Sequence, residues 1–333
     1  MLTTPSLRAC PTRAAYTFHD HAPQESSFEA ALLQGLSEPV KSIPFRFLYD
    51  AAGSALFEKI CEQPEYYPTR TEMRILEREA PAIAQLAGPG AQLVELGSGA
   101  GQKIKLLLDA MADPAAYISV EISRAALLDA ASRLADERPD LDIHAVWADY
   151  SAPFALPLSP EAGRVVGFFP GSSIGNFEPD QAREFLALWA RRLGPDADMI
   201  VGVDLVKPAE ILERAYDDSA GVTAAFSLNV LRRANRELGA DFDPDGFQHE
   251  ARYRPASGAV EIHLVSRRSQ RVQIAGRTFV FSAGERLHIE NSHKYDLEGF
   301  AALAQEAGFV WHTAWTDPQR WFSVHYLRTP GAR

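Results

Sequence analysis

A glycine-rich loop directly after a short apolar segment is the feature that most restricts the fold of this chain. The segment QLVEL at residues 92–96 is followed by glycines at alternate positions, Gly97, Gly99 and Gly101, and then by an amphipathic stretch from Gln102. Glycine adopts positive φ angles easily and lets other groups approach the backbone closely. This order predicts a strand, a tight turn and a helix, the unit from which helix-covered parallel sheets are built.

The same alternation of apolar runs and helical patterns continues as far as residue 205. Strands are expected at 92–96, 117–122, 143–147, 165–169 and 199–205. Helices are expected at 27–35, 54–61, 102–111, 124–136 and 179–193, with a longer one that begins at Thr69 or Thr71. Near-continuous apolar strands separated by helices indicate an α/β fold with a parallel sheet that is covered on both faces.

Three classes of ligand use glycine loops of this kind, and the spacing separates them. A phosphate-binding P-loop requires G-x-x-x-x-G-K-[ST], but Lys103 follows Gln102 and no serine or threonine comes next. A dinucleotide loop requires G-x-G-x-x-G, and Gln102 occupies the third glycine position. The third pattern, acidic-x-G-x-G-x-G, is matched in full from Glu95 to Gly101. This pattern is the first motif of S-adenosylmethionine-dependent methyltransferases.

Two acidic residues stand where such a cofactor would need them. Glu121 ends the next expected strand, the position from which a carboxylate takes the ribose hydroxyls. Asp149 follows the strand after that, where the adenine is expected, and Tyr150 is beside it. We therefore expect S-adenosylmethionine at the carboxyl edge of the sheet. The alternative is a tight turn with incidental acids.

The expected elements change character after residue 205. Helices at 208–217 and 222–238 precede closely spaced strand-like runs at 250–290, with a hairpin turn at Ser257–Gly258. A helix at 297–307 and a hairpin that turns at Asp317–Pro318 follow, which is how a Rossmann-like methyltransferase sheet usually ends. We predict a cofactor-binding domain of residues 70–205 plus 295–330, and an α+β substrate-binding domain of residues 10–69 plus 206–294. Residues 1–25 are expected to be loosely ordered.

Composition excludes several kinds of partner. The net charge is −11 and no lysine–arginine cluster is present, which disfavours nucleic acid and anionic membranes. Cys10 and Cys61 form neither a disulfide framework nor a zinc site, and the histidines lack metal-ligand spacing, so we expect no metal. Without a signal peptide or an apolar run of membrane-spanning length, a cytoplasmic location is expected. We therefore expect a small molecule as the substrate. The sequence does not decide the oligomeric state, and it is compatible with a monomer.

Four long segments of the chain are distinctive: LYDAAGSALFEKICEQPEYYPTRTE, ELGSGAGQKIKLLLDAM, FFPGSSIGNFEP and AYDDSAGVTAAFSLNVLRRANRELGADFD. They resemble the L-histidine Nα-methyltransferase family, whose members trimethylate free histidine to hercynine, the first step of ergothioneine biosynthesis. The resemblance extends from about Pro44 to the C-terminus.

The resemblance implies roles for five residues on the substrate side. It places Tyr66 near the substrate α-amino group and Asn176 on the amino-acid end, and we predict that these two are catalytic. It places Tyr216 on the carboxylate. It also implies that Glu290 and Ser292 hydrogen-bond the imidazole, which would select histidine because a buried acid pairs with a ring nitrogen.

The resemblance also implies which residues face the cofactor. These are Tyr49, Gly97, Lys103, Glu121 and Asp149, to which the motif adds Gly99, Gly101 and Tyr150. The chain departs from the family's usual pattern at three positions: Glu121 replaces an aspartate, Ser173 replaces a threonine and Ile262 replaces a methionine of the pocket wall. The change at Ile262 affects the expected fit of the substrate.

Other interpretations remain open at this point. Tyr66 could be a core residue, Asn176 a helix cap, Lys103 a cover for its helix surface, and Glu290 a solvent-facing residue. Asp217–Asp218 could be a solvated helix end. A related enzyme could act on another free amino acid such as tryptophan, and a non-catalytic cofactor-binding subunit would carry the same loop.

Overall fold

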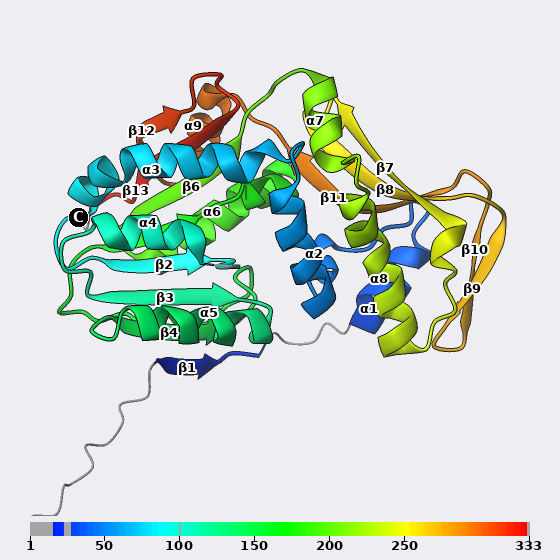
Figure 1. Ribbon diagram of the computed structural model, residues 1–333, viewed down its shortest axis with the longest axis horizontal. Helices are drawn as coiled ribbons and strands as arrows, with labels where there is room; N and C mark the ends of the chain where they lie inside the picture. Colours follow the sequence, from blue (N-terminus) through cyan, green and yellow to red (C-terminus); the bar gives the residue numbers. More distant parts are fainter. Residues whose placement is uncertain (1–15, 23–27, 100, 332–333) are drawn as a thin grey trace, which may run out of the picture.

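The computed structural model describes residues 16–22, 28–99 and 101–331 of the chain (Figure 1). Its centre is an eight-stranded sheet with the order β1-β4-β3-β2-β5-β6-β13-β12. The strands are β1 (Thr17–Asp20), β2 (Gln92–Leu96), β3 (Ala116–Glu121), β4 (Asp142–Trp147), β5 (Val165–Phe169), β6 (Asp198–Asp204), β12 (Val310–Thr316) and β13 (Phe322–Arg328). The strands from β1 to β6 are parallel to one another, whereas β13 is antiparallel to both of its neighbours, β6 and β12.

Helices cover both faces of this sheet. Three of them pack on one face: α3 (Tyr67–Ala87), α4 (Gln102–Ala110) and α5 (Arg124–Glu137). Two others pack on the opposite face: α6 (Pro179–Leu193) and α9 (Leu297–Glu306). The helix α6 shows why: its buried residues Ala182, Phe185, Leu186, Trp189 and Leu193 recur at helical spacing and form a single apolar stripe. The predicted α/β fold with a covered parallel sheet is confirmed.

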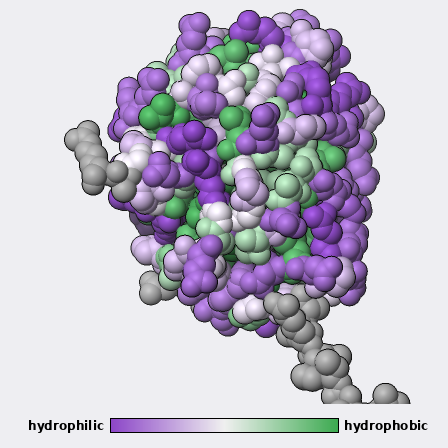
Figure 2. All heavy atoms as spheres, turned by 90° about the vertical axis from the view of Figure 1, so that its left-hand side faces the viewer, coloured by the Kyte–Doolittle hydropathy of each residue, from purple (hydrophilic) through white to green (hydrophobic). Residues whose placement is uncertain are grey.

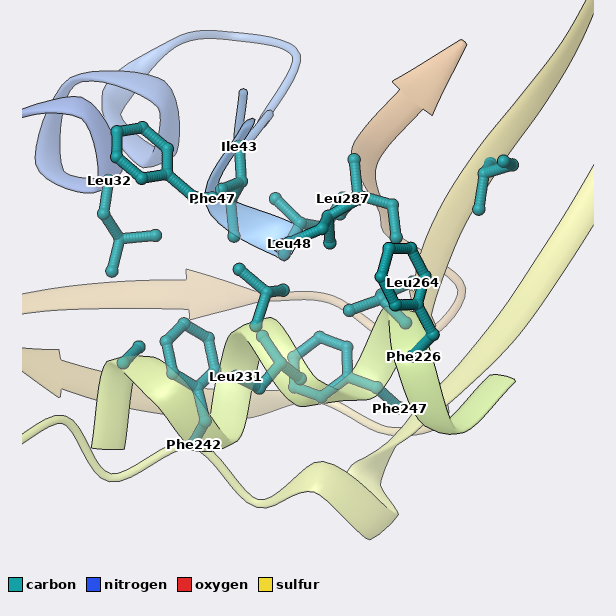
Figure 3. Packing of buried hydrophobic residues seen from close by; sticks show 14 of the residues in the cluster. Leu32, Ile43, Phe47, Leu48, Phe226, Leu231, Phe242, Phe247, Leu264 and Leu287 are labelled. Carbon is teal, nitrogen blue, oxygen red and sulfur yellow. The ribbon is translucent and has the colours of Figure 1, made fainter. Parts of the chain in front are cut away.

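A second hydrophobic core lies beside the large sheet (Figures 1 and 3). Its strands are β7 (Phe247–Arg254), β8 (Ala259–Ser266) and β11 (Arg286–His293), in the antiparallel order β11-β8-β7, together with the hairpin β9 (Gln270–Ile274) and β10 (Arg277–Phe281). Its helices are α1 (Phe28–Ser37), η1 (Phe45–Leu48), α2 (Ala51–Glu62), α7 (Ala209–Tyr216), α8 (Val222–Leu238) and η3 (Pro244–Gly246). In Figure 3, Phe226 and Leu231 of α8 pack against Leu264 and Leu287 of the sheet.

The two passages by which the segment after β6 leaves the large sheet and returns to it lie side by side. Residue Leu205, directly after β6, forms a parallel bridge with Tyr295, directly before α9. Backbone hydrogen bonds join Val206 N to Tyr295 O at 3.0 Å and Tyr295 N to Asp204 O at 3.2 Å. This junction brings the carboxyl end of β6 to the end of β11, and the candidate site is built around it.

One face of the molecule is mainly hydrophilic. Figure 2 shows the face at the left of Figure 1, where hydrophilic side chains predominate and apolar ones are scattered between them. Among the described residues, no helix combines the length and the apolar character that crossing a membrane requires.

Most predicted elements are found within a few residues of their expected limits, and the differences have physical reasons. Residues 1–25 were expected to be loosely ordered, which is wrong for Thr17–Asp20, because this segment pairs with β4 as the edge strand β1. Helix α3 begins at Tyr67, and Thr71 lies inside it with its hydroxyl bonded to Tyr67 O. Residues 1–15, 23–27 and Cys10 lie outside the described part, and the division into two domains stays a prediction.

Candidate active site

The glycine loop between β2 and α4 has the geometry that its sequence predicts. Gly97, Gly99 and Gly101 have φ angles of 69°, 48° and 71°, a region that side-chain-bearing residues rarely adopt. A Cβ atom at Gly99 or Gly101 would meet no heavy atom within 4 Å, whereas one at Gly97 would lie 3.7 Å from the ring of Tyr150. The loop therefore presents bare backbone to open space, which is the cradle that a ligand lying close to the backbone requires.

Glu121 extends from the end of β3 toward this loop. Its carboxylate accepts hydrogen bonds from Ser123 N at 2.9 Å and from Gly99 N at 3.4 Å, and the side chain is buried. Burial raises the pKa of Glu121, and these backbone donors oppose the rise. No side chain of the described residues satisfies its remaining lone pairs, so the carboxylate is available to a diol at the position where the ribose is expected.

Asp149 and Tyr150 form the third part of this edge, after β4. The carboxylate of Asp149 accepts from the backbone and hydroxyl of Ser151, at 2.8 and 2.5 Å. The ring of Tyr150 stands edge-on to Phe169 and Phe185, with centroid separations of 5.6 and 5.8 Å. The loop is therefore held firmly, and Tyr150 forms an apolar wall beside Gly97.

Lys103 is neither a surface cover nor a free cation. Its ammonium group lies 2.6 Å from the carboxylate of Glu72, which is completely buried in α3. Glu72 also accepts from Gly171 N at 2.9 and 3.0 Å, and a Cβ atom at Gly202 would overlap its carboxylate at 2.0 Å. Glu72 thus ties the start of α4 to the loop after β5. The sequence analysis missed it, although it ends the YYPTRTE segment.

The acidic residue of the glycine motif faces the protein interior. Glu95 is 1% exposed and accepts a hydrogen bond of 2.5 Å from the hydroxyl of Tyr117. Burial raises the pKa of Glu95 to about 8, so this carboxyl group is mainly protonated at neutral pH. Its position supports the strand from which the loop departs, whereas Glu121 is the acid that contacts the loop.

A cleft of about 810 Å³ opens between α6 and β11, and Asn176 and Glu290 both line it. Asn176 ends the short helix η2 (Ser173–Asn176), which packs closely on β11. The absence of a side chain at Gly175 allows this contact, since a Cβ atom there would lie only 2.7 Å from His293 O. The cap of α6 is Glu178, so the interpretation of Asn176 as a cap is wrong. The side chain of Asn176 has no hydrogen bond to any described residue, and it is therefore available to a ligand.

A β-bulge in β11 aims the substrate-side residues. The pairing of β11 with β8 shifts between His288 and Glu290, so that three residues of β11 oppose two of β8. Beyond the bulge, Glu290 and Ser292 are two positions apart and therefore lie on the same face of the strand, and Lys294 continues this spacing. Ile262 is directly opposite Glu290 and is buried, so the predicted wall residue does lie beside the predicted selector.

Glu290 is 9% exposed, which excludes the interpretation that it faces solvent. Its carboxyl group has no hydrogen-bond partner within the described ranges. Burial raises the pKa of Glu290 to about 8, and the nearby charge of Lys294 opposes this rise. An unpaired, buried carboxyl group is unfavourable by itself, so this side chain points to a ligand with polar hydrogens or ring nitrogens.

The predicted tyrosines gather in one aromatic cluster. Tyr66 stands edge-on to Tyr216 and Phe57, with centroid separations of 6.0 and 6.2 Å, and Tyr49 stands edge-on to Phe57 and Phe226 at 5.6 and 5.4 Å. Burial raises the pKa of both Tyr49 and Tyr66 well above the ordinary value, and the charge of Glu290 adds to the rise. Both hydroxyl groups therefore stay protonated at neutral pH.

Tyr216 and Ser292 meet in a buried polar network that the sequence analysis did not foresee. Their hydroxyl oxygens are 2.8 Å apart, and Lys294 donates to both, at 2.8 Å and 2.6 Å. Lys294 also lies 2.8 Å from Asp204, which is fully buried. Tyr67 and Lys207 donate to the same carboxylate at 2.7 Å.

No group of histidine, cysteine or acidic side chains among the described residues could hold a metal ion. The glycine cradle, the Glu121 carboxylate and the Asp149–Tyr150 loop lie at the carboxyl ends of three adjacent parallel strands. This fold and this site define an S-adenosylmethionine-dependent methyltransferase.

Comparisons with known proteins agree. A model of the family described as histidine-specific, SAM-dependent methyltransferases matches residues 28–329. The histidine N-alpha-methyltransferases of Mycolicibacterium smegmatis and Mycobacterium tuberculosis are 42% and 39% identical to this chain, each over 85% of it and 89% of the relative. Ergothioneine biosynthesis protein 1 of Neurospora crassa is 30% identical over 86% of this chain and 33% of its own length. The chain belongs to the histidine-specific, S-adenosylmethionine-dependent methyltransferase family.

The loop geometry predicts that Gly97→Val abolishes cofactor binding. A β-branched residue is strongly disfavoured at a φ of 69°, and its methyl groups would enter the cradle. Calorimetry with S-adenosylhomocysteine measures the affinity, and far-UV circular dichroism checks the fold. Gly88→Val is the matched control, because Gly88 also has a positive φ of 78° but follows α3, outside the loop. Native affinity in Gly97→Val would show that the cofactor lies elsewhere.

The burial of Glu95 predicts a component of stability that depends on pH. Its pKa is about 8 in the folded protein against an ordinary value of 4.5, so the folded state binds this proton more tightly. The stabilisation is complete below pH 4.5 and is lost as the pH rises through 8. The stability of the wild type should therefore fall relative to Glu95→Gln over this range, as urea unfolding between pH 5 and 9 will measure. The surface substitution Glu137→Gln should show no such trend, and a constant difference for Glu95→Gln would contradict the assignment.

Proposed function

We propose that this methyltransferase trimethylates the α-nitrogen of free L-histidine to give hercynine, the first step of ergothioneine biosynthesis. The observation that carries the proposal is the buried Glu290 carboxyl group, which lines the cleft with Asn176 and has no partner in the described chain. It is electrostatically coupled to Tyr49 and Tyr66, so the three groups share one buried region.

The reaction requires a neutral amine held in line with the methyl donor. S-adenosylmethionine supplies an electrophilic methyl group on a positively charged sulfur. Asn176 and Tyr66 orient the amine of the substrate, and fixing this geometry contributes most of the acceleration expected for such a displacement. Tyr49 and Tyr66 remain protonated, so neither serves as a phenolate base. Each can position the nitrogen through its hydroxyl group while the proton of the ammonium form leaves before attack.

The aromatic cluster suits the changing charge of the substrate. Each methyl transfer brings the nitrogen closer to a permanent quaternary ammonium, which can no longer donate hydrogen bonds. The faces of aromatic rings stabilise such cations by about 0.5–2 kcal/mol. Tyr49, Tyr66 and Phe57 provide these rings within one cluster. The same pocket can therefore hold a primary amine and its trimethylated product.

Glu290 supplies the selection for an imidazole ring. With a pKa of about 8, it is mainly a carboxylic acid before substrate binds, and its O–H can donate a hydrogen bond to the unprotonated ring nitrogen. In its ionised form it accepts the ring N–H, and that charge-assisted hydrogen bond is stronger than a neutral one. A side chain without a nitrogen at this position would leave the acid buried and unpaired, which disfavours its binding.

A second candidate substrate is another free amino acid such as tryptophan. The buried Ile262 directly opposite Glu290 favours this alternative, because it adds apolar wall beside the acid and an indole N–H could also reach Glu290. A non-catalytic role is disfavoured by the intact set of Tyr66, Asn176 and Tyr216. We place the reaction in the cytoplasm, with the free amino acid and the cofactor as its only required small molecules.

The proposed function predicts the product directly. With excess S-adenosylmethionine, histidine should gain three methyl groups, all on the α-nitrogen. Mass spectrometry gives the number of groups, and fragmentation separates methylation of the amine from methylation of the ring. Methyl groups on the imidazole, or a complete absence of transfer to histidine, would contradict the proposal. The rate should fall at low pH, because protonation removes the lone pair of the amine.

Specificity should depend on Glu290. In Glu290→Ala, both the acid and its volume are removed, so kcat/KM for histidine should fall by roughly 10- to 100-fold, in line with the loss of one charge-assisted hydrogen bond. The ratio of kcat/KM values for tryptophan and histidine should rise. Glu261→Ala is the control, because Glu261 is on the neighbouring strand and pairs with Arg254 on the protein surface. An unchanged ratio in Glu290→Ala would mean that another residue selects the ring.

A further inference from the structure

Arg192, in the last turn of α6, holds the loop after β4 with both ends of its guanidinium group. Its Nη1 atom donates to the backbone oxygen of Tyr150 at 3.1 Å, and its Nη2 atom donates to that of Ala152. Trp189, one turn earlier on the helix, also donates to Tyr150 O, at 3.2 Å. A guanidinium group is planar and its donors have a fixed geometry, so bonds to two different carbonyl groups restrain the loop more than one bond would.

Arg192 makes these contacts without a paired acid. Its other neighbours are aromatic: the guanidinium carbon lies 4.6 Å from the ring centroid of Phe154 and 5.1 Å from that of Trp189. Within the described ranges it forms no ion pair with a carboxylate. Burial lowers the pKa of Arg192, and the charge of Asp149 opposes this effect, so these two groups interact electrostatically. The hydrogen bonds that offset its burial all go to the loop after β4.

The loop that Arg192 holds is a tight turn with an unoccupied carboxylate oxygen. Ala152 N donates to Asp149 O at 2.9 Å, which closes the turn. The Oδ1 atom of Asp149 accepts from both the backbone N–H and the hydroxyl group of Ser151, at 2.8 and 2.5 Å. Its Oδ2 atom accepts no hydrogen bond from any described residue. The turn therefore presents one free carboxylate acceptor to a ligand.

This acceptor lies where the base of the cofactor is expected. The glycine cradle, Glu121 and the turn follow the neighbouring strands β2, β3 and β4. A Cβ atom at Gly97 would lie 3.7 Å from the ring of Tyr150, and Ser151 lines the cleft between α6 and β11. Adenine carries an exocyclic amino group, which is a donor and complements a free carboxylate oxygen. Hypoxanthine carries an oxygen at the same position, and this acceptor would face the carboxylate unfavourably.

We propose that Arg192 is a positioning residue that makes this methyltransferase specific for the adenine base of its cofactor. It acts through Asp149, because the guanidinium group fixes two carbonyl groups of the turn and the turn fixes the direction of Oδ2. Without Arg192, the cradle and Glu121 still hold the rest of the cofactor, but the base is no longer selected. The inference goes beyond the proposed function, since it does not depend on which amino acid is methylated.

The test compares two ligands that differ at one position of the base. S-adenosylhomocysteine carries the amino group, and S-inosylhomocysteine carries an oxygen in its place. Calorimetry should show that the wild type binds the adenine compound at least about 10-fold more tightly. In Arg192→Met, the affinity for S-adenosylhomocysteine should fall by roughly 10-fold, whereas that for S-inosylhomocysteine should change by less than about threefold, because only adenine loses a charge-assisted hydrogen bond. Equal affinity of the wild type for both compounds would overturn the proposal, as would equal losses for both in Arg192→Met.

Arg183→Met is the matched control. Arg183 is on the same helix, but it pairs with Asp180 at 3.0 Å and with Glu306 at 3.8 Å, and neither contact reaches the turn. This variant should keep the native preference for adenine, and a loss as large as that of Arg192→Met would contradict the assignment. Arg192→Lys keeps the charge but not the planar fork, so it should retain only part of the preference.

A double-mutant cycle separates positioning from a general loss of structure. Asp149→Ala removes the acceptor directly, so it should lower the preference for adenine by itself. If Arg192 acts through Asp149, adding Arg192→Met to Asp149→Ala should lower this preference no further. Additive losses would show that Arg192 does not act through Asp149.

Two further points keep the result decisive. Far-UV circular dichroism checks folding without a ligand, and if Arg192→Met does not fold, Arg192→Lys takes its place in the comparison. A native preference for adenine in Arg192→Lys would then overturn the proposal. None of these measurements uses an amino-acid substrate, so a failure to methylate histidine would contradict the proposed function alone.

Discussion

The ion pair between Asp204 and Lys294 is the interaction on which the arrangement of this molecule depends. Asp204 is the last residue of β6 and Lys294 follows β11, so the pair joins the edge of the large sheet to the strand that carries Glu290 and Ser292. Each charge would be strongly destabilising if it were buried alone. Burial by itself raises the pKa of Asp204, but the two lysines outweigh burial and hold it below its ordinary value. Separating the two segments would leave both charges without this partner, so the pair favours the arrangement in which they meet.

Backbone irregularities and glycines make room for several of the polar groups that enter this interior. The bulge before Glu290 turns the end of β11, so that an acid and a hydroxyl group follow apolar residues on the same strand. Gly175 allows the loop that carries Asn176 to touch the backbone of that strand. Gly202 leaves space for the buried carboxylate of Glu72. Bulges and glycines near functional sites have this general use, because they re-aim side chains at a cost that regular pairing avoids.

The sequence predicts those parts of the fold that depend on periodicity. Strands such as β2 and helices such as α8 have clear apolar patterns, and the glycine motif with Glu121 and Asp149 follows from the order of the strands. The four-residue strand β1 was missed because TFHD is too short to show a clear pattern, and its pairing with β4 defines it as a strand. Short edge strands carry little pattern of their own.

Buried charges were harder to foresee than the elements that carry them. Glu72, Asp204, Lys207 and Lys294 are charged residues, and such residues are usually exposed. Their partners are distant along the chain: Asp204 and Lys294, for example, are brought together only by the return of the chain to the sheet. Ser292 shows the same limit. Its assignment to the imidazole came from resemblance, whereas its observed contacts are with Tyr216 and Lys294.

The parallel bridge between Leu205 and Tyr295 has a consequence for how such a protein can diversify. The segment between them leaves and re-enters the sheet at one point, so its two ends are already held together by hydrogen bonds. An insertion with adjacent ends can change in length, or be exchanged, without altering the strand order around it. Changes in this segment can then alter the substrate specificity without moving the strands that carry the cofactor-binding loops. Residues that touch the junction, Asp204 and Lys294 among them, would have to change in concert.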